Sequence, residues 1–379
     1  MLLSLPISCH RRYLSVVLSL GLASSLQGAI VITSVSTTLD TATSFSQTVP
    51  GAGSSSFGSD TNYTINFGVQ GDLRMTGFAA NSTNFTVNTN LLTNVFLRRN
   101  SAQLSGVTPN HQIAWYRATD TNYSSGDTRN VQASFVPTLE ALLGGNIINR
   151  GTDNMFENTG NNSGNNNNIE RADFIFSGND ALTPQNQAHL DGVGFTILER
   201  GGNDPIYVSA ILGINGSQVT NLSQPVLVAA GDWGNTDLWP TGDNRTLVLR
   251  DTAVAGEYRP SDVTPDSQRL VGLYFSLETL GVSVGDTVYG YAIMAGDTNM
   301  TIAGADLDRL LDWNDAEIFP TNTTSANGGL DLVSGGSAFI QDGLDTDGLF
   351  VAIPEPSVFG LVAALGAFGY VFVRRRRMR

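Results

Sequence analysis

Apolar and polar residues alternate along much of the chain between residues 30 and 352. In the stretch from Thr61 to Val69, the apolar residues Tyr63, Ile65, Phe67 and Val69 fall on one face, because successive side chains of a strand point to opposite faces. Similar short apolar runs occur at residues 73–79, 111–118, 131–136, 172–177, 194–200, 205–214, 225–230, 245–251, 269–277 and 287–294. Gly, Asn, Asp and Pro separate these runs, so the pattern predicts many short strands joined by turns.

Helical patterns are few. Residues 137–145 end in a glycine pair that suits a helix C-terminus, and residues 304–313 offer one or two amphipathic turns. We therefore expect a mainly β protein, an antiparallel β-sandwich or jelly roll with very few short helices, over residues 30–352. Residues 158–168 are almost all Asn and Gly, which supply little area to bury, so they are predicted to be a loop and a possible soft boundary inside this domain.

The first apolar segment has the layout of a secretory signal peptide. Two arginines precede an apolar stretch that runs to about Leu26, and small residues follow it. We expect residues 1–29 to be a signal peptide that is cleaved after Gly28 or Ala29. The alternative is an uncleaved anchor, and the shortness of the apolar stretch argues against it.

A second apolar segment, residues 358–373, contains 16 residues and no charge. As a helix it would be about 24 Å long, slightly shorter than the ~30 Å hydrocarbon core, so a single transmembrane helix needs flanking arginine side chains that reach outward. Such arginines follow it directly, as Arg374, Arg375, Arg376 and Arg377. Because arginines flanking membrane segments stay in the cytoplasm, we expect both charged ends to be cytoplasmic and the middle of the chain to lie outside.

Pro354, Glu355 and Pro356 stand just before this second segment. Each proline fixes its own φ and disfavours helix in the residue before it, so we expect an extended, accessible stretch at the membrane face. A juxtamembrane spacer before a permanent anchor is the alternative. The Pro-Glu-Pro motif, the apolar helix and the arginine cluster together resemble the C-terminal sorting signal of bacterial PEP-CTERM proteins, which an exosortase processes.

The resemblance covers residues 353–379. It implies export, a transient inner-membrane intermediate, removal of the tail by an exosortase-type enzyme, and release to the cell surface or an extracellular polysaccharide matrix. Glycosylation is a frequent property of such proteins. The resemblance carries no information about the fold or activity of the middle of the chain.

Charge is distributed unevenly along the sequence. All 20 basic residues are Arg, so chemistry that needs lysine, such as a P-loop or a Schiff base, is excluded. Between the two ends, 13 Arg face 33 Asp and Glu, which gives that part a net charge of −20. Such a surface repels nucleic acid and suits cations or neutral sugars. The only cysteine, Cys9, lies in the leader, so no disulfide stabilises the mature chain.

Candidate catalytic groups are scarce. Outside the leader the only histidines are His111 and His189, and neither a Gly-x-Ser-x-Gly elbow nor a His-Glu-x-x-His motif occurs. A pair of carboxylates could serve a glycosidase, but the sequence does not locate such a pair. Glu170 and Glu199 each precede an arginine, which exposed ion pairs at strand ends explain equally well. We predict no enzyme, no catalytic residue and no organic cofactor.

Two binding features remain. Asp342, Asp345 and Asp347 place oxygen ligands at short spacing, as calcium requires, although the EF-hand spacing is absent and a polar turn is the alternative. Trp233 and Trp239 lie in a polar loop, where they could stack on sugar rings or plug the end of a sandwich. The favoured function is a non-enzymatic surface or matrix protein. The alternative is a secreted carbohydrate-binding, lectin-like module that is assisted by calcium.

Overall fold

The computed structural model describes residues 28–49, 63–88, 93–100, 113–119, 128–153, 155–156, 169–240, 245–251, 258–260, 266–319, 344 and 346–354. Within these ranges the protein is mainly β with few short helices, as the alternation of apolar residues predicts. The strand predicted at residues 61–69 is β3, and its residues Tyr63, Ile65 and Phe67 are all buried. Val69, which we expected on the same face, lies beyond the end of β3 and is 47% exposed.

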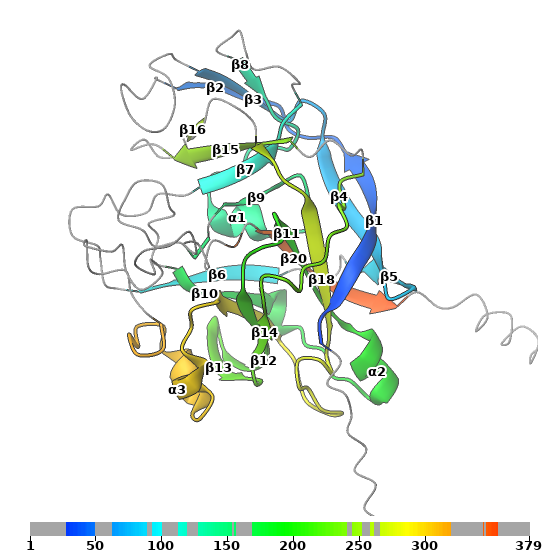
Figure 1. Cartoon of the computed structure of the whole chain (residues 1–379), viewed down its shortest axis with the longest axis vertical. Coiled ribbons are helices and arrows are strands. Elements are labelled where there is room, and N and C mark those ends of the chain that lie inside the picture. The colour runs from blue at the N-terminus through cyan, green and yellow to red at the C-terminus, as the bar shows by residue number, and fades with distance from the viewer. Residues whose placement is uncertain are drawn as a thin grey trace, which may run out of the picture.

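Six strands close into a barrel in the order β1-β18-β11-β20-β5-β4, and every neighbouring pair is antiparallel (Figure 1). These strands are β1 (Ile30–Asp40), β4 (Asp72–Ala80), β5 (Thr83–Val87), β11 (Gly194–Arg200), β18 (Leu270–Ser276) and β20 (Thr346–Pro354). A closed barrel has no free strand edge, unlike the two open sheets of the sandwich or jelly roll that we expected.

Three further sheets surround the barrel. The largest has the order β13-β12-β19-β10-β6 with β14 beside β12, and comprises β6 (Thr93–Arg99), β10 (Ile169–Phe176), β12 (Ile206–Asn215), β13 (Gln218–Leu222), β14 (Val226–Val228) and β19 (Gly290–Ala295). Another has the order β16-β15-β7-β9 with β17 beside β15, and comprises β7 (Ile113–Arg117), β9 (Arg150–Thr152), β15 (Arg245–Asp251), β16 (Tyr258–Pro260) and β17 (Asp266–Ser267). The smallest contains β2 (Phe45–Val49), β3 (Tyr63–Phe67) and β8 (Thr128–Asn130), and its β3–β8 pair is parallel.

The described helices are short: α1 (Leu139–Leu143), α2 (Gln187–Gly192) and α3 (Met300–Ala303), with 3-10 turns η1 (Ser177–Asn179) and η2 (Leu307–Leu311). The helix predicted at residues 137–145 is α1, and Thr138 caps it by accepting a hydrogen bond from the Ala141 amide. None of the described helices is long and apolar enough to cross a membrane. Both predicted apolar segments, up to Leu26 and at 358–373, lie outside the described residues.

Three hydrophobic cores are present among the described residues, and two of them involve the barrel. One fills the barrel interior, where the rings of Phe78, Phe85 and Tyr274 pack with centroids 4.5 to 5.6 Å apart. The other lies between the barrel and the surrounding sheets, and contains Phe195 and Tyr291. Strand β11 contributes to both cores, so all seven of its residues are buried. Strands covered on both faces show continuous apolar runs rather than alternation.

Two sequence predictions need correction. Residues 131–136 form no strand beyond a single bridge between Val131 and Ala118, and the Ser134 amide donates instead to the side chain of Asp72. The barrel also combines strands from both sides of residues 158–168: β1, β4 and β5 precede them, and β11, β18 and β20 follow. The two halves therefore build one barrel, and these residues do not separate two independent units.

Candidate functional sites

The two loop tryptophans are buried. Trp233 is 0% exposed and its indole Nε1 donates to the Asp204 carbonyl at 2.7 Å. Trp239 is 4% exposed, donates to the Gln268 carbonyl at 3.2 Å, and packs edge-on against Trp115 with ring centroids 6.0 Å apart. Because neither indole presents a free face, the predicted sugar stacking is not available to them here, and both act as core residues.

The predicted calcium residues fall at the start of β20. Asp347 lies in this strand, while Asp342 and Asp345 lie outside the described residues. Residues 346–348 are extended strand rather than the polar turn that we considered as the alternative. Among the described residues, no group of three or more His, Cys, Asp or Glu side chains could bind a metal ion. The calcium hypothesis stays a prediction.

The first residue of the predicted sorting motif lies inside the folded body. Pro354 is the last residue of β20 and pairs with Phe85 of β5, so the motif starts extended, as its prolines predict. The folded body thus reaches two residues beyond the boundary expected at residue 352. The rest of the predicted signal lies outside the described residues, namely Glu355, Pro356, Arg374, Arg375, Arg376 and Arg377.

The two Glu-Arg pairs are buried, which corrects the expectation of exposed ion pairs. Glu199 and Arg200 end β11, Glu170 and Arg171 lie in β10, and none of the four is more than 4% exposed. Both strands are covered on both faces, so even their charged residues lie in the interior. Buried charges require partners, and the structure supplies them.

Glu199 and Arg200 belong to a polar cluster at one end of the barrel. Arg200 pairs with Asp153 and donates to the Thr246 hydroxyl at 3.1 Å, while a carboxylate oxygen of Glu199 accepts from the Gly202 amide. Burial raises the pKa of Asp204 to about 6; the Asp153 charge adds to this rise, whereas a hydrogen bond with Glu199 and the Arg200 charge oppose it.

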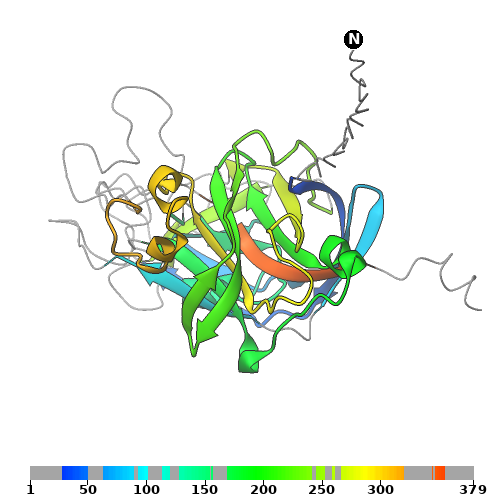
Figure 2. The same cartoon turned by 90° about the horizontal axis from the view of Figure 1, so that it is seen from below.

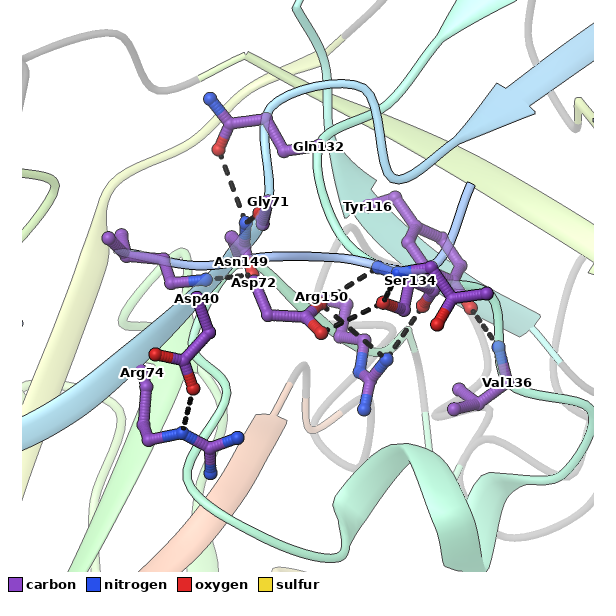
Figure 3. Close-up of polar contacts among 12 residues, drawn as sticks. Asp40, Gly71, Asp72, Arg74, Tyr116, Gln132, Ser134, Val136, Asn149 and Arg150 are labelled. Carbon is purple, nitrogen blue, oxygen red and sulfur yellow. Dashed lines mark hydrogen bonds and ion pairs between the residues drawn. The ribbon is translucent and has the colours of Figure 1, made fainter. Parts of the chain in front are cut away.

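A second polar network ties β4 to β9 and to the loop at residues 131–136 (Figure 3). Asp72 accepts from both the amide and the hydroxyl of Ser134, each at 2.8 Å. Arg150 donates to the Ser134 carbonyl at 2.6 Å and lies 4.0 Å from Asp72. Burial raises the pKa of the neighbouring Tyr116 phenol to about 12 and lowers the pKa of the Arg150 guanidinium.

Asn149 completes this network. Its amide accepts from the Leu73 backbone at 3.1 Å. It also donates to the Gly71 carbonyl at 2.9 Å, and Asn149 and Gly71 lie side by side in Figure 3. Arg74 pairs with Asp40 beside it at 2.6 Å. These bonds satisfy backbone groups where β4 begins, so the network fastens the barrel to its neighbouring loops.

The chemistry of these clusters is that of structural ion pairs. Ser134 donates its proton to a carboxylate, but a nucleophile also needs a base such as imidazole. In the described part of the chain the only histidine is His189, which is exposed in α2 and accepts a hydrogen bond from the Gln185 amide at 3.3 Å. It does not face Ser134, which lies at the opposite end of the barrel near Asp72, the first residue of β4.

Comparison of the chain with protein-family models, curated proteins and solved structures finds no match. The fold itself defines a mainly β protein built around a closed, six-stranded antiparallel barrel.

Proposed function

We propose that this chain is a non-enzymatic, exported surface or extracellular-matrix protein. An N-terminal signal peptide directs its export, and the signal at residues 353–379 directs sorting by an exosortase-type enzyme. One observation carries the proposal: the first strand starts at Ile30 and the last strand ends at Pro354, so the body fills the interval between the two apolar segments. The described strands use no residue from either segment.

The stability and the surface charge of the folded body are compatible with an extracellular location. The closed barrel leaves none of its own six strands with a free edge, and aromatic rings pack in its interior, while the sheet that contains β10 holds the buried ion pair of Arg171 and Asp173. The negative charge of the body disfavours binding to nucleic acid. It is compatible with binding to neutral polysaccharide or surface glycans.

The polar clusters favour a structural role over catalysis. The carboxylates Asp72, Asp153 and Asp173 are each engaged by arginine. The lectin-like alternative is not pursued, because Trp233 and Trp239, on which it depended, are buried.

Sorting can be tested with substitutions that lie outside the barrel strands and so leave the fold intact. Pro354 pairs within the barrel, whereas Glu355 and Pro356 lie beyond the last strand, so only these two residues should be replaced. We expect wild-type protein outside the cell without its tail, and the Glu355→Ala/Pro356→Ala variant in the inner membrane with its tail intact. Ser357→Ala is the matched control and should behave like wild type.

Export of the double variant with its tail trimmed as in wild type would contradict the sorting proposal. The non-enzymatic part has its own test, in which the purified mature protein is incubated with extracellular polysaccharide from the producing cells. We expect the polymer length to stay unchanged, and a steady release of oligosaccharide would overturn this part.

A further inference from the structure

The directions of the barrel strands place both ends of the folded body together. β1 is antiparallel to β18, β18 to β11, and β11 to β20. After three reversals, β20 runs opposite to β1. The first residue of β1, Ile30, therefore lies at the same end of the barrel as the last residue of β20, Pro354.

Strand pairing and one ring contact agree with this arrangement. Ile30 pairs with Tyr274, Pro354 pairs with Phe85, and the rings of Tyr274 and Phe85 are 4.5 Å apart. One aromatic cluster thus connects the two ends of the body, although they are more than 300 residues apart in the sequence.

We call this end of the barrel the tail end. It is formed by Ile30, Pro354, the turn at Asn81 and Ser82 between β4 and β5, and α2. Helix α2 leads into β11 and contacts β18 and β20, and Figure 2 shows it beside the end of β20. The opposite end of the barrel, where β1 finishes and β4 begins, faces the small sheet β2-β3-β8 (Figure 1).

The connections to the two apolar segments are short. Three residues separate Leu26 from Ile30, and three separate Pro354 from residue 358. An extended chain spans at most ~3.6 Å per residue, so each connection reaches roughly 10 Å. The headgroup layer on each side of the hydrocarbon core is itself about 5 to 8 Å thick.

We propose that in the uncleaved precursor the tail end of the barrel faces the membrane at the level of the lipid headgroups. The barrel axis then lies along the membrane normal, and the sheet β2-β3-β8 lies on the side of the barrel away from the bilayer. This inference rests on the proposed function, because it requires both segments to be membrane segments.

The charge of the tail end favours release after cleavage. Asp191 in α2 and Glu278 after β18 are exposed carboxylates, joined by the side-chain amide of Gln187 at 2.7 and 2.8 Å. Carboxylates repel anionic lipid headgroups, so the body has no electrostatic attraction to the bilayer once its two connections are cut.

The test uses the full chain with Cys9→Ser, inserted into vesicles of phosphatidylethanolamine and phosphatidylglycerol that contain a nitroxide-headgroup lipid and no processing enzyme. A fluorophore is attached through Thr83→Cys at the tail end or through Leu39→Cys at the opposite end; both positions are exposed. We expect the nitroxide to quench the Thr83 label several-fold more strongly than the Leu39 label. Equal quenching, or stronger quenching at Leu39, would overturn the proposal.

In a second measurement, both positions of the test pair lie outside the described strands. Gly28→Cys and Ser357→Cys flank the two ends of the body, and a Cβ at Gly28 meets no atom within 4 Å. We expect a short bismaleimide to join this pair within one chain, and to leave the control pair of Leu39→Cys and Ser357→Cys unjoined. Equal yields for the two pairs would contradict the arrangement.

These vesicle measurements stay separate from the proposed function. A failure of sorting in cells would leave them unchanged, because neither requires export or cleavage. Conversely, a chain that is sorted in cells but has distant ends in vesicles would refute only this inference.

Discussion

Asp173 lies at the centre of the most buried charged cluster among the described residues. It accepts from Arg171 at 2.7 and 3.1 Å and from Arg98 at 2.5 Å. Both guanidinium groups lie over the ring of Trp313, at 5.6 and 5.1 Å from its centroid, and Arg171 also donates to the Leu310 carbonyl. The cluster therefore fastens the segment with α3 and η2 onto the largest sheet.

The substitution Asp173→Asn keeps the shape of the side chain and removes its charge. Asp173 and Arg171 are both 0% exposed, whereas the Arg98 side chain is 11% exposed, so the substitution would leave the Arg171 guanidinium in the interior without its carboxylate. Removing one partner of a buried ion pair costs about 3 to 5 kcal/mol, because the remaining charge is left uncompensated. That is a large share of the roughly 5 to 15 kcal/mol that stabilises a folded domain.

Urea unfolding of the mature protein measures this loss directly. We expect the transition of Asp173→Asn to move to clearly lower urea with an unchanged slope, which indicates lost stability rather than a changed unfolded state. Asp180→Asn is the control, because Asp180 is exposed, and it should change the free energy of unfolding by less than about 0.5 kcal/mol. If Asp173→Asn lowered the free energy of unfolding by less than about 1 kcal/mol, this would refute the claim that these buried ion pairs stabilise the packing of α3 and η2 on the sheet.

Three further predictions concern the body. Gly290→Ala should destabilise it by at least about 2 kcal/mol in urea unfolding, because Gly290 has φ +144° and an added Cβ would collide with the Phe174 carbonyl; Gly231→Ala, with open space and no positive φ, should change little. Trp233→Phe should cost about 1 to 2 kcal/mol, since a buried carbonyl loses its donor, and unchanged stability would contradict this. Burial raises the pKa of Asp204 from 3.8 to about 6, so the folded state binds this proton more tightly, and its contribution is present below about pH 4 and is lost as pH rises through 6. A pKa difference of one between the folded and unfolded states is worth about 1.4 kcal/mol, and the pKa of Asp204 rises from 3.8 to about 6, so Asp204→Asn should remove a fall of roughly 3 kcal/mol between pH 4 and 7; an unaltered profile would contradict it.

The sequence predicted the elements whose pattern is local. The alternation around Tyr63 predicted β3, and the glycine pair after residue 143 predicted the end of α1. Strand β20 was missed, because Asp347 and its neighbouring glycine have the composition of a turn. Barrel closure depends on pairings such as Ile30 with Tyr274, which no local pattern encodes.

Burial of the candidate site residues could not be predicted from the sequence either. A Glu-Arg dipeptide such as residues 199–200 is typical of a solvated strand end, and only the layers packed on both faces of β11 bury it. Trp233 and Trp239 lie in a polar loop, yet that loop folds back so that both indoles enter the cores. Burial of this kind is decided by tertiary packing and not by the neighbours along the chain.

The central claim is that both apolar segments are removed and that the barrel is the working part of the protein outside the cell. The intact mass of the protein recovered from the cell surface or the medium tests it most directly. We predict a chain that begins at residue 29 or 30 and ends after Pro354, with any glycans as added mass, because a shorter chain would lose part of β20. A recovered chain that still contains residues 358–373, or protein found only in the cytoplasm, would contradict the claim.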